Sequence, residues 1–126
     1  MKTVKTLVLG ASLKENRYSN MAIRSLVTNK IDVVAFGLRK GIVQGIEIDT
    51  ERKQYENIHT ISLYLNSKNQ KTYYDYILSL NPKRIIFNPG TENYELIEIL
   101  RENNISFEIA CTLSMLSIGN YSEMIN

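Results

Sequence analysis

The sequence predicts an α/β protein with a doubly wound, mainly parallel five-stranded sheet and helices on both faces. Two observations carry this prediction. Short apolar segments alternate with segments of helical periodicity along the chain, as in βαβ units with right-handed crossovers. The apolar segments lack the polar alternation of half-exposed strands, which indicates strands buried on both faces. Residues 1–126 are therefore expected to form a single Rossmann-like domain.

One strand and one helix are predicted at the beginning of the sequence. Residues 3–9 are rich in leucine and β-branched side chains and end at Gly10, which is typical of a buried strand. The following helix is expected to run to about Asn29, because its apolar side chains recur every three or four residues. Ser19 or Asn20 is expected to cap this helix.

Two more strands are predicted in the middle of the chain. They are residues 31–36, closed by Gly37, and residues 60–65. Residues 41–57 between them show neither helical nor strand periodicity. Because residues 51–57 are polar, we expect a loop with a short turn of helix there.

The second half of the chain continues the alternation of helices and strands. Two strands are expected at residues 83–87 and 105–110. Three helices are expected at residues 66–80, 93–103 and 112–118, and a proline ends the first of them.

The formal net charge of +2 is unevenly distributed along the chain. Residues 1–45 hold eight of the 15 lysines and arginines against two acidic residues, so they carry +6 and the remainder carries −4. An uneven scatter of surface charge explains this, and so does a partner with several negative charges. Because the chain has no basic run and no basic–aromatic interleaving, we expect a phosphorylated small molecule rather than nucleic acid.

The apolar runs and the cysteine content predict a cytoplasmic protein without a membrane partner. The longest apolar runs are far shorter than the roughly 20 residues that span a bilayer. The first residues show no apolar stretch of signal-peptide length. Cys111 is the only cysteine, so it forms no internal disulfide and fits a reducing compartment.

In sheets of this kind, ligands bind beyond the carboxyl ends of the strands, where strand order reverses. The loop after the first expected strand begins with glycine, but Leu13 and Glu15 stand where a dinucleotide fingerprint has further glycines. A glycine here is also common in α/β proteins generally. The loop's hydroxyl, amide and guanidinium groups nonetheless suit phosphate. The candidates are Gly10, Ser12, Arg17, Ser19 and Asn20.

The loop after the second expected strand carries two adjacent cations, Arg39 and Lys40, close to Gly37, and it has no acidic residue. A NAD-binding domain has an acid near this point that binds the ribose hydroxyls. Cations in its place favour a phosphorylated ribose, with either the 2′-phosphate of NADP or the 3′-phosphate of coenzyme A. Two solvated charges in a turn are the alternative interpretation.

The loops after the third and fourth expected strands are less specific indicators of a ligand. Tyr64 and Leu65 offer an aromatic and an apolar wall to a ligand, although Tyr64 is equally well explained as core. Asn88, Pro89 and Gly90 combine a tight turn with a side-chain amide. That combination suits an amide-rich ligand, and it also suits a plain turn.

Taken together, the segments at residues 10–12, 17–22, 64–66, 87–93 and 110–113 resemble a known family in their order and spacing. They are similar to the small stand-alone CoA-binding-domain proteins, which in turn resemble the amino-terminal domain of the succinyl-CoA synthetase alpha subunit. The segments at residues 87–93 and 110–113 are the more specific ones, because the glycine loop is shared with many nucleotide-binding proteins.

The resemblance implies coenzyme A, free or acylated, with its diphosphate on the first loop and its phosphorylated ribose near the second. Leu13 and Leu38 depart from the family by standing where it often has proline, which loosens both loops. On this resemblance, the ligand-binding residues are Gly10, Ser12, Arg17, Ser19, Asn20, Gly37, Arg39, Lys40, Tyr64, Leu65, Asn88, Pro89 and Gly90.

No catalytic or metal-binding motif is recognised, so we expect binding without catalysis. His59, the only histidine, precedes the third expected strand and should lie at the edge of the sheet opposite the ligand. Cys111 follows the fifth expected strand and is the one candidate reactive group. A buried, inert thiol is its ordinary interpretation, and a mixed disulfide with coenzyme A is the functional one.

Three functions stay open at this point. The chain is a CoA-binding module, an NADP-type or other phosphorylated-nucleotide binder related to redox chemistry, or a protein-interaction domain with a degenerate ligand site. A homodimer is also open, because Tyr73, Tyr74 and Tyr76 give the helix expected at residues 66–80 an aromatic face that a second copy would cover.

Overall fold

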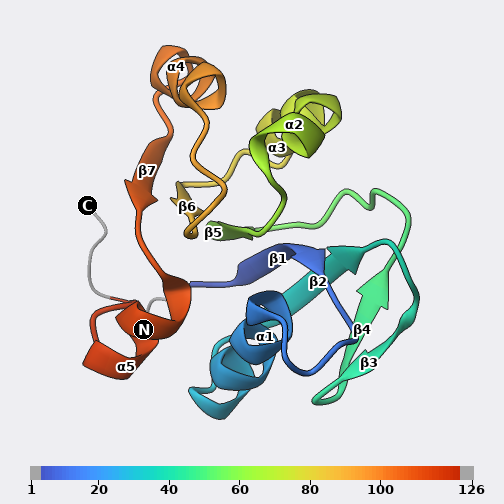
Figure 1. Cartoon of the computed structure of the whole chain (residues 1–126). Coiled ribbons are helices and arrows are strands. Elements are labelled where there is room, and N and C mark those ends of the chain that lie inside the picture. The colour runs from blue at the N-terminus through green and yellow to red at the C-terminus, as the bar shows by residue number, and fades with distance from the viewer. Residues whose placement is uncertain (1–3, 123–126) are drawn as a thin grey trace.

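A computed structural model describes residues 4–122, in which one sheet carries helices on both faces (Figure 1). The order across this seven-stranded sheet is β3-β4-β2-β1-β5-β6-β7. All neighbouring strands are parallel except β3 and β4. The strands are β1 (Thr6–Ala11), β2 (Val33–Gly37), β3 (Gly41–Val43), β4 (Ile46–Asp49), β5 (Thr60–Leu63), β6 (Arg84–Phe87) and β7 (Ser106–Ile109).

The helices form two groups, one on each face of the sheet. In Figure 1, α1 and α5 lie below the sheet, and α2, α3 and α4 lie above it. Within residues 4–122, no helix has the length and apolar character needed to cross a bilayer. The helices are α1 (Tyr18–Thr28), α2 (Ser67–Gln70), the 3-10 helix η1 (Lys71–Tyr73), α3 (Tyr74–Ser79), α4 (Tyr94–Glu102) and α5 (Thr112–Ile118).

Strand β1 occupies the centre of the sheet and has a parallel neighbour on each side. Leu7 of β1 lies opposite Val34 of β2 and Ile61 of β5. The chain first forms β2, β3 and β4 on one side of β1, with β3 at the edge of the sheet, and it then returns to the other side to form β5, β6 and β7. The chain is therefore a mixed α/β protein with a Rossmann-like sheet, and the switch point where such sheets bind ligands lies at the carboxyl end of β1.

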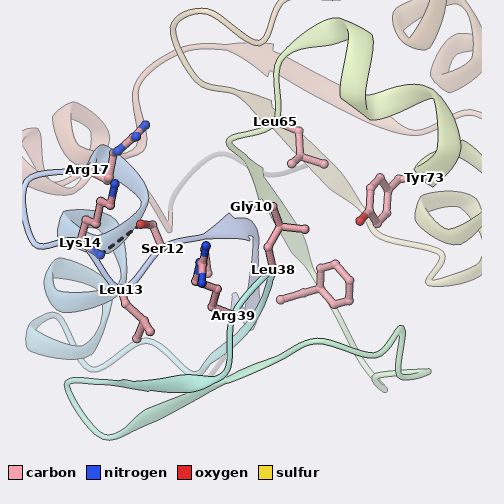
Figure 2. Close-up of a pocket in the computed structure, with 12 residues that line it drawn as sticks. Gly10, Ser12, Leu13, Lys14, Arg17, Leu38, Arg39, Leu65 and Tyr73 are labelled. Atoms are coloured by element: carbon pink, nitrogen blue, oxygen red, sulfur yellow. Dashed lines mark hydrogen bonds between the residues drawn. The ribbon is translucent and has the colours of Figure 1, made fainter.

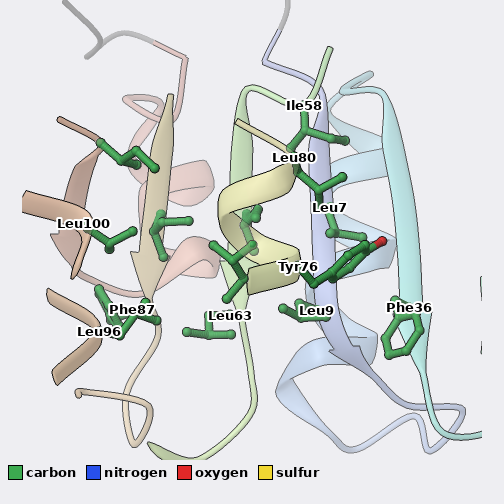
Figure 3. Packing of buried hydrophobic residues seen from close by; sticks show 14 of the residues in the cluster. Leu7, Leu9, Phe36, Ile58, Leu63, Tyr76, Leu80, Phe87, Leu96 and Leu100 are labelled. Atoms are coloured by element: carbon green, nitrogen blue, oxygen red, sulfur yellow. The ribbon is translucent and has the colours of Figure 1, made fainter. Parts of the chain in front are cut away.

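Apolar cores fill the space between the sheet and each group of helices. On one face, Leu7, Leu63 and Phe87 of three strands pack with Ile77 of α3 and Leu96 of α4, and all five are fully buried (Figure 3). The other core is formed by apolar side chains of β1, β2, β4, β6, α1 and α5. Its fully buried members are Val8, Ile23, Leu26, Ala35 and Ile86.

The expectation of five strands was wrong, because the sheet has seven. The two additional strands come from residues 41–49, which form the antiparallel hairpin of β3 and β4 beside β2. The hairpin turns at Gln44 and Gly45, whose φ angles of 51° and 80° are both left-handed. These strands are short and β4 carries two acidic residues, so they lack the apolar run that identifies the other strands, and Gln44 stands where such turns usually carry asparagine.

The helix expected over residues 66–80 is interrupted, because α2, η1 and α3 follow one another there. Asn66 caps α2, and its side chain accepts a hydrogen bond from the Asn69 N–H at 2.9 Å. The interruption falls at Tyr73, which has φ −107° and ψ 0°. Residues 51–57 contain no helix, contrary to expectation. They run beside α3, where the Tyr76 hydroxyl donates to the Lys53 carbonyl at 2.5 Å.

The start of α1 also differs from expectation. Arg17 is the N-cap residue, so neither Ser19 nor Asn20 caps this helix. Both lie inside the first turn and are buried. Because the Arg17 side chain makes no capping hydrogen bond, the helix begins without a side-chain acceptor for its first N–H groups.

Truncation of Leu63 tests the packing of the central strands. We expect Leu63→Ala to lower the free energy of unfolding by about 3–5 kcal/mol, because this fully buried side chain leaves a cavity between β5 and the helices above it. The matched control is Leu38→Ala, which removes a leucine that is 87% exposed and should cost less than about 0.5 kcal/mol. Denaturant unfolding of both variants measures the difference, and equal costs would contradict the described core.

Candidate functional site

A cavity of about 320 Å³ lies at the switch point, between the loops that leave β1 and β2 and the segment that follows β5 (Figure 2). It is the place where ligands bind in open α/β sheets. Its lining combines backbone, three cationic side chains and an apolar wall. The lining residues are Gly10, Ala11, Ser12, Leu13, Lys14, Arg17, Phe36, Gly37, Leu38, Arg39, Leu65 and Tyr73.

Gly10 shapes the floor of this cavity. It forms a bulge at the end of β1, since Leu9 lies opposite Phe36 whereas Ala11 lies opposite Gly37. The φ angle of Gly10 is 102°, and a Cβ there would lie 3.1 Å from the Tyr64 carbonyl carbon. The position therefore requires glycine for both its conformation and the close approach of the segment after β5.

Gly37 closes the floor from the side of β2. A Cβ at Gly37 would lie 2.3 Å from the carbonyl oxygen of Ala11, a separation that no side chain tolerates. The loops after β1 and β2 can therefore diverge from almost the same point. Leu13 then crosses toward β3, where its side chain packs against Gly41.

Three cations, Lys14, Arg17 and Arg39, contribute to the lining (Figure 2). None of the lining residues is acidic. Within residues 4–122, none of the three cations forms an ion pair with an acidic side chain. Cations that are not neutralised within the fold give the cavity a positive potential, which favours an anionic ligand.

An apolar wall faces these cations across the cavity. Its aromatic part consists of Phe36, at the end of β2, and Tyr73, at the end of η1, whose rings meet edge to face with centroids 5.7 Å apart. The guanidinium of Arg52 lies 4.1 Å from the centroid of the Tyr73 ring and fixes that ring from outside. Leu65 and Leu38 extend the wall on either side. Such a surface accepts a flat heteroaromatic group.

Six of the predicted ligand-binding residues meet in this cavity: Gly10, Ser12, Arg17, Gly37, Arg39 and Leu65. The prediction missed six others. Ala11, Leu13, Lys14 and Leu38 belong to the very loops that the sequence analysis singled out. Phe36 belongs to an expected strand and Tyr73 to an expected helix, where apolar side chains look like ordinary core. Both line the cavity because β2 ends near Phe36 and the helix breaks at Tyr73.

Ser19 and Asn20 lie behind the first loop rather than in the cavity. Their exposed fractions are 5% and 2%. The side-chain amide of Asn20 donates to the Ser12 carbonyl at 2.9 Å, and its oxygen accepts from Arg24 Nε at 2.9 Å. Asn20 therefore contacts the loop and not the space in which a phosphate would lie.

Lys40 diverges from its neighbour Arg39. It lines a separate surface hollow of about 410 Å³ together with Asp49 and Lys53. Asp49 pairs with Lys53 at 2.9 Å and accepts a hydrogen bond from the Tyr55 hydroxyl. Burial opposes ionisation of Asp49, but these hydrogen bonds and the charges of Lys53 and Lys40 outweigh it and lower the pKa of the carboxyl. Lys40 thus faces an acid of the protein itself.

Tyr64 turns away from the cavity, although the next residue, Leu65, lines it. Its side chain packs against the core on the face covered by α1 and α5. Burial raises the pKa of the Tyr64 hydroxyl to about 12, despite opposing hydrogen bonds with Ser62 and Thr112. The tyrosine is therefore a neutral core residue under ordinary conditions.

Asn88, Pro89 and Gly90 lie outside the cavity lining. The buried Asn88 amide donates to Ser62 Oγ and to the Leu63 carbonyl, each at 3.0 Å. Its oxygen accepts from the Thr112 N–H at 2.8 Å. Asn88 thereby joins β5, β6 and the start of α5. Pro89 and Gly90 follow it as exposed turn residues.

Gln70 is a further positioning residue that the sequence did not reveal. It is fully buried and donates to the carbonyls of Leu65 and Thr91 at 2.8 and 2.7 Å. Its oxygen accepts from Asn93 at 2.9 Å. Because one carbonyl that it holds belongs to Leu65, Gln70 fixes the apolar wall from behind. No local signal marks this role, since a glutamine in a helix is usually exposed.

His59 lies at the amino end of β5, as expected, and so at the opposite edge of the sheet from the cavity. Its Nδ1 lies 2.8 Å from Thr60 Oγ1. The surrounding hollow, of about 600 Å³, is lined by His59, Lys83 and neighbouring loop residues. The histidine is therefore remote from any ligand at the switch point.

Comparisons with known proteins place this geometry in context. A family model described as a CoA binding domain matches residues 4–117. A crystal structure of an uncharacterized protein is similar to the chain, with 49% identity, a TM-score of 0.91, and coverage of 95% of this chain and 99% of the other. No curated protein matches the chain.

Two more distant structures share the fold. A hypothetical protein from Pyrococcus horikoshii OT3 has 19% identity and a TM-score of 0.82 over 93% of this chain and 84% of the other. A Thermus thermophilus protein has 17% identity and a TM-score of 0.81 over 92% and 89% of the respective chains. Likeness at this level of identity concerns the fold alone.

Cys111 provides a test of the electrostatics at this edge of the sheet. Burial alone would raise the pKa of its thiol, but hydrogen bonds from the Ser114 hydroxyl and from the N–H groups of Ser114 and Leu113 outweigh burial and lower it. The rate of alkylation by iodoacetamide should therefore reach half its plateau at a lower pH than for a cysteine in an unstructured peptide. Ser114→Ala should move this midpoint to higher pH. A midpoint that Ser114→Ala leaves unchanged would contradict the assigned hydrogen bonds.

Proposed function

The chain belongs to the family of CoA-binding domains, and we propose that its switch-point cavity binds coenzyme A or an acyl-CoA. Membership of the family supports CoA binding in general. We further propose where on the protein coenzyme A binds and which residues bind it. One observation carries it: three cations that have no acidic partner among residues 4–122 face a wall of Phe36, Tyr73, Leu65 and Leu38 in a single cavity.

The chemistry of this lining matches the nucleotide end of coenzyme A. That end carries a diphosphate and a 3′-phosphate close to a flat adenine ring, so it needs several positive charges beside an apolar surface. The volume of about 320 Å³ is at the lower end of the roughly 300–1,000 Å³ typical of ligand pockets. It suits the nucleotide portion, and we propose that the pantetheine arm extends along the outer surface.

We assign the diphosphate to the first loop, where Lys14 and Arg17 supply charge and Ser12 supplies a hydroxyl. The 3′-phosphate is assigned to Arg39, the lining cation from the second loop. Lys40 has a weaker part in this assignment, because the Asp49 carboxylate already lies near it. A single arginine offers a planar pair of donors that suits a phosphate dianion.

The lining supports binding rather than chemistry. It contains no histidine, cysteine, aspartate or glutamate, and these are the residue types that most often act as a general base or as a nucleophile. We propose that the protein carries or senses coenzyme A. NADP shares the phosphorylated ribose, and a titration against both ligands separates the two proposals.

Calorimetric titration with coenzyme A and dephospho-CoA tests the role of Arg39. We expect coenzyme A to bind about tenfold more tightly, which corresponds to about 1.4 kcal/mol for the 3′-phosphate. Arg39→Ala should remove most of this difference. Lys40→Ala removes the same charge one residue away and is the matched control, in which the difference should largely persist.

Three results would contradict different parts of the proposal, namely the position of the 3′-phosphate, the identity of the ligand, and ligand binding itself. Equal affinity of the wild-type chain for the two ligands would remove the assignment of the 3′-phosphate. Tighter binding of NADP than of coenzyme A would favour the dinucleotide alternative. An absence of binding to any of these ligands would favour the interaction domain.

A further inference from the structure

The loop at residues 12–17 is held from behind by two side chains of α1. Asn20 donates to the carbonyl of Ser12 at 2.9 Å. Arg24 donates from Nε to the Asn20 side-chain oxygen at 2.9 Å and from a terminal nitrogen to the carbonyl of Glu15 at 2.8 Å. These two residues, called the brace below, form one hydrogen-bonded connection between two carbonyls of the loop. Asn20 is only 2% exposed, so its bonds are shielded from water.

The brace fixes the direction of two peptide planes. In a trans peptide unit, the carbonyl and the N–H of the following residue point in opposite directions. The Ser12 and Glu15 carbonyls point toward the brace. The N–H groups of Leu13 and Asn16 consequently point away from it. Within residues 4–122, neither of these N–H groups donates to a protein acceptor.

Free N–H groups and nearby cations together suit an anion. The two N–H groups belong to the same loop as Lys14 and Arg17, whose side chains line the cavity. Backbone N–H groups aimed at a common anion are a recurrent means of holding phosphate. If the same peptide planes were reversed, their carbonyl oxygens would face the anion and repel it. The brace therefore selects the orientation of the loop that favours phosphate.

We propose that Asn20 and Arg24 are positioning residues that preorganise the loop for the diphosphate of coenzyme A. The identity of the anion rests on the proposed function, whereas the effect of the brace on the loop does not. Neither residue lines the cavity. Two donor groups of Arg24 are committed to protein oxygens, so this arginine acts through the loop and not by direct contact with ligand.

Replacement of Arg24 tests this proposal. Arg24→Met keeps the length of the side chain and removes its donors, and we expect it to weaken coenzyme A binding about tenfold. Amide hydrogen exchange in residues 12–17 of the ligand-free protein should accelerate, while the melting temperature changes by only a few degrees. The control is Arg101→Met, which removes the same charge from an exposed site on α4 and should leave affinity and loop exchange unchanged.

Two further measurements distinguish positioning from direct attraction. Arg24→Lys keeps the charge, but a single ammonium does not reproduce the forked contact with Asn20 and Glu15. We expect its affinity to fall nearly as far as that of Arg24→Met, with the salt dependence of binding unchanged in both variants. Wild-type affinity in Arg24→Lys, or a weaker salt dependence in Arg24→Met, would overturn the proposal, because either result means that the charge itself attracts the ligand.

The exchange measurement separates failure of this proposal from failure of the proposed function. If the wild-type chain does not bind coenzyme A, the proposed function is wrong, but faster loop exchange in Arg24→Met still supports the brace. If wild-type binding is intact and loop exchange in Arg24→Met equals that of the wild type, the brace is wrong and the proposed function stands.

Discussion

The close approach of three backbone segments at the end of β1 is the constraint on which the site depends. Near the end of β1, Gly10 has a left-handed φ angle, and a Cβ at this position would lie 3.1 Å from the carbonyl carbon of Tyr64. Gly37 has no room for a Cβ against the Ala11 carbonyl. Any larger residue at either position would push the loops apart. The cavity exists because its floor is backbone alone, so that side chains from three loops can surround one space.

The two halves of the carboxyl edge of the sheet use polar side chains in opposite ways. Above β5 and β6, the amides of Asn88 and Gln70 have all their main hydrogen-bonding groups satisfied by the protein. Above β1 and β2, Lys14, Arg17 and Arg39 have no acidic partner within residues 4–122. Self-repulsion among such cations disfavours the folded state, and a bound anion relieves it. The half above β5 and β6 is thus fixed by hydrogen bonds, and the half above β1 and β2 carries the charges that we propose bind the ligand.

Much of the fold follows from sequence periodicity, and much less of the site does. The central strands are strongly apolar and α4 has a helical period, so the sequence locates their ends within about three residues. The hairpin of β3 and β4 was not predicted because its strands are short and β4 carries two acidic residues in place of a continuous apolar run, and because its turn lacks the usual asparagine. Tyr73 escaped for another reason: its apolar spacing matches a core position, and only the break between η1 and α3 places the ring in the cavity.

Asparagine was the least predictable residue type in these loops, and hydrogen-bond satisfaction explains why. An amide at the end of a strand has donors and an acceptor that suit a ligand, and the same groups suit a backbone that lacks its regular partners. Burial decides between the two uses, because a buried amide must be bonded within the protein. Asn88 and Asn20 are each 2% exposed and already bonded to neighbouring backbone or side chains. Within residues 4–122, Arg17 and Arg39 form no ion pair with an acidic side chain. At this sheet edge, then, amides hold the backbone in place, and these cations are the groups that stay available for the proposed phosphate.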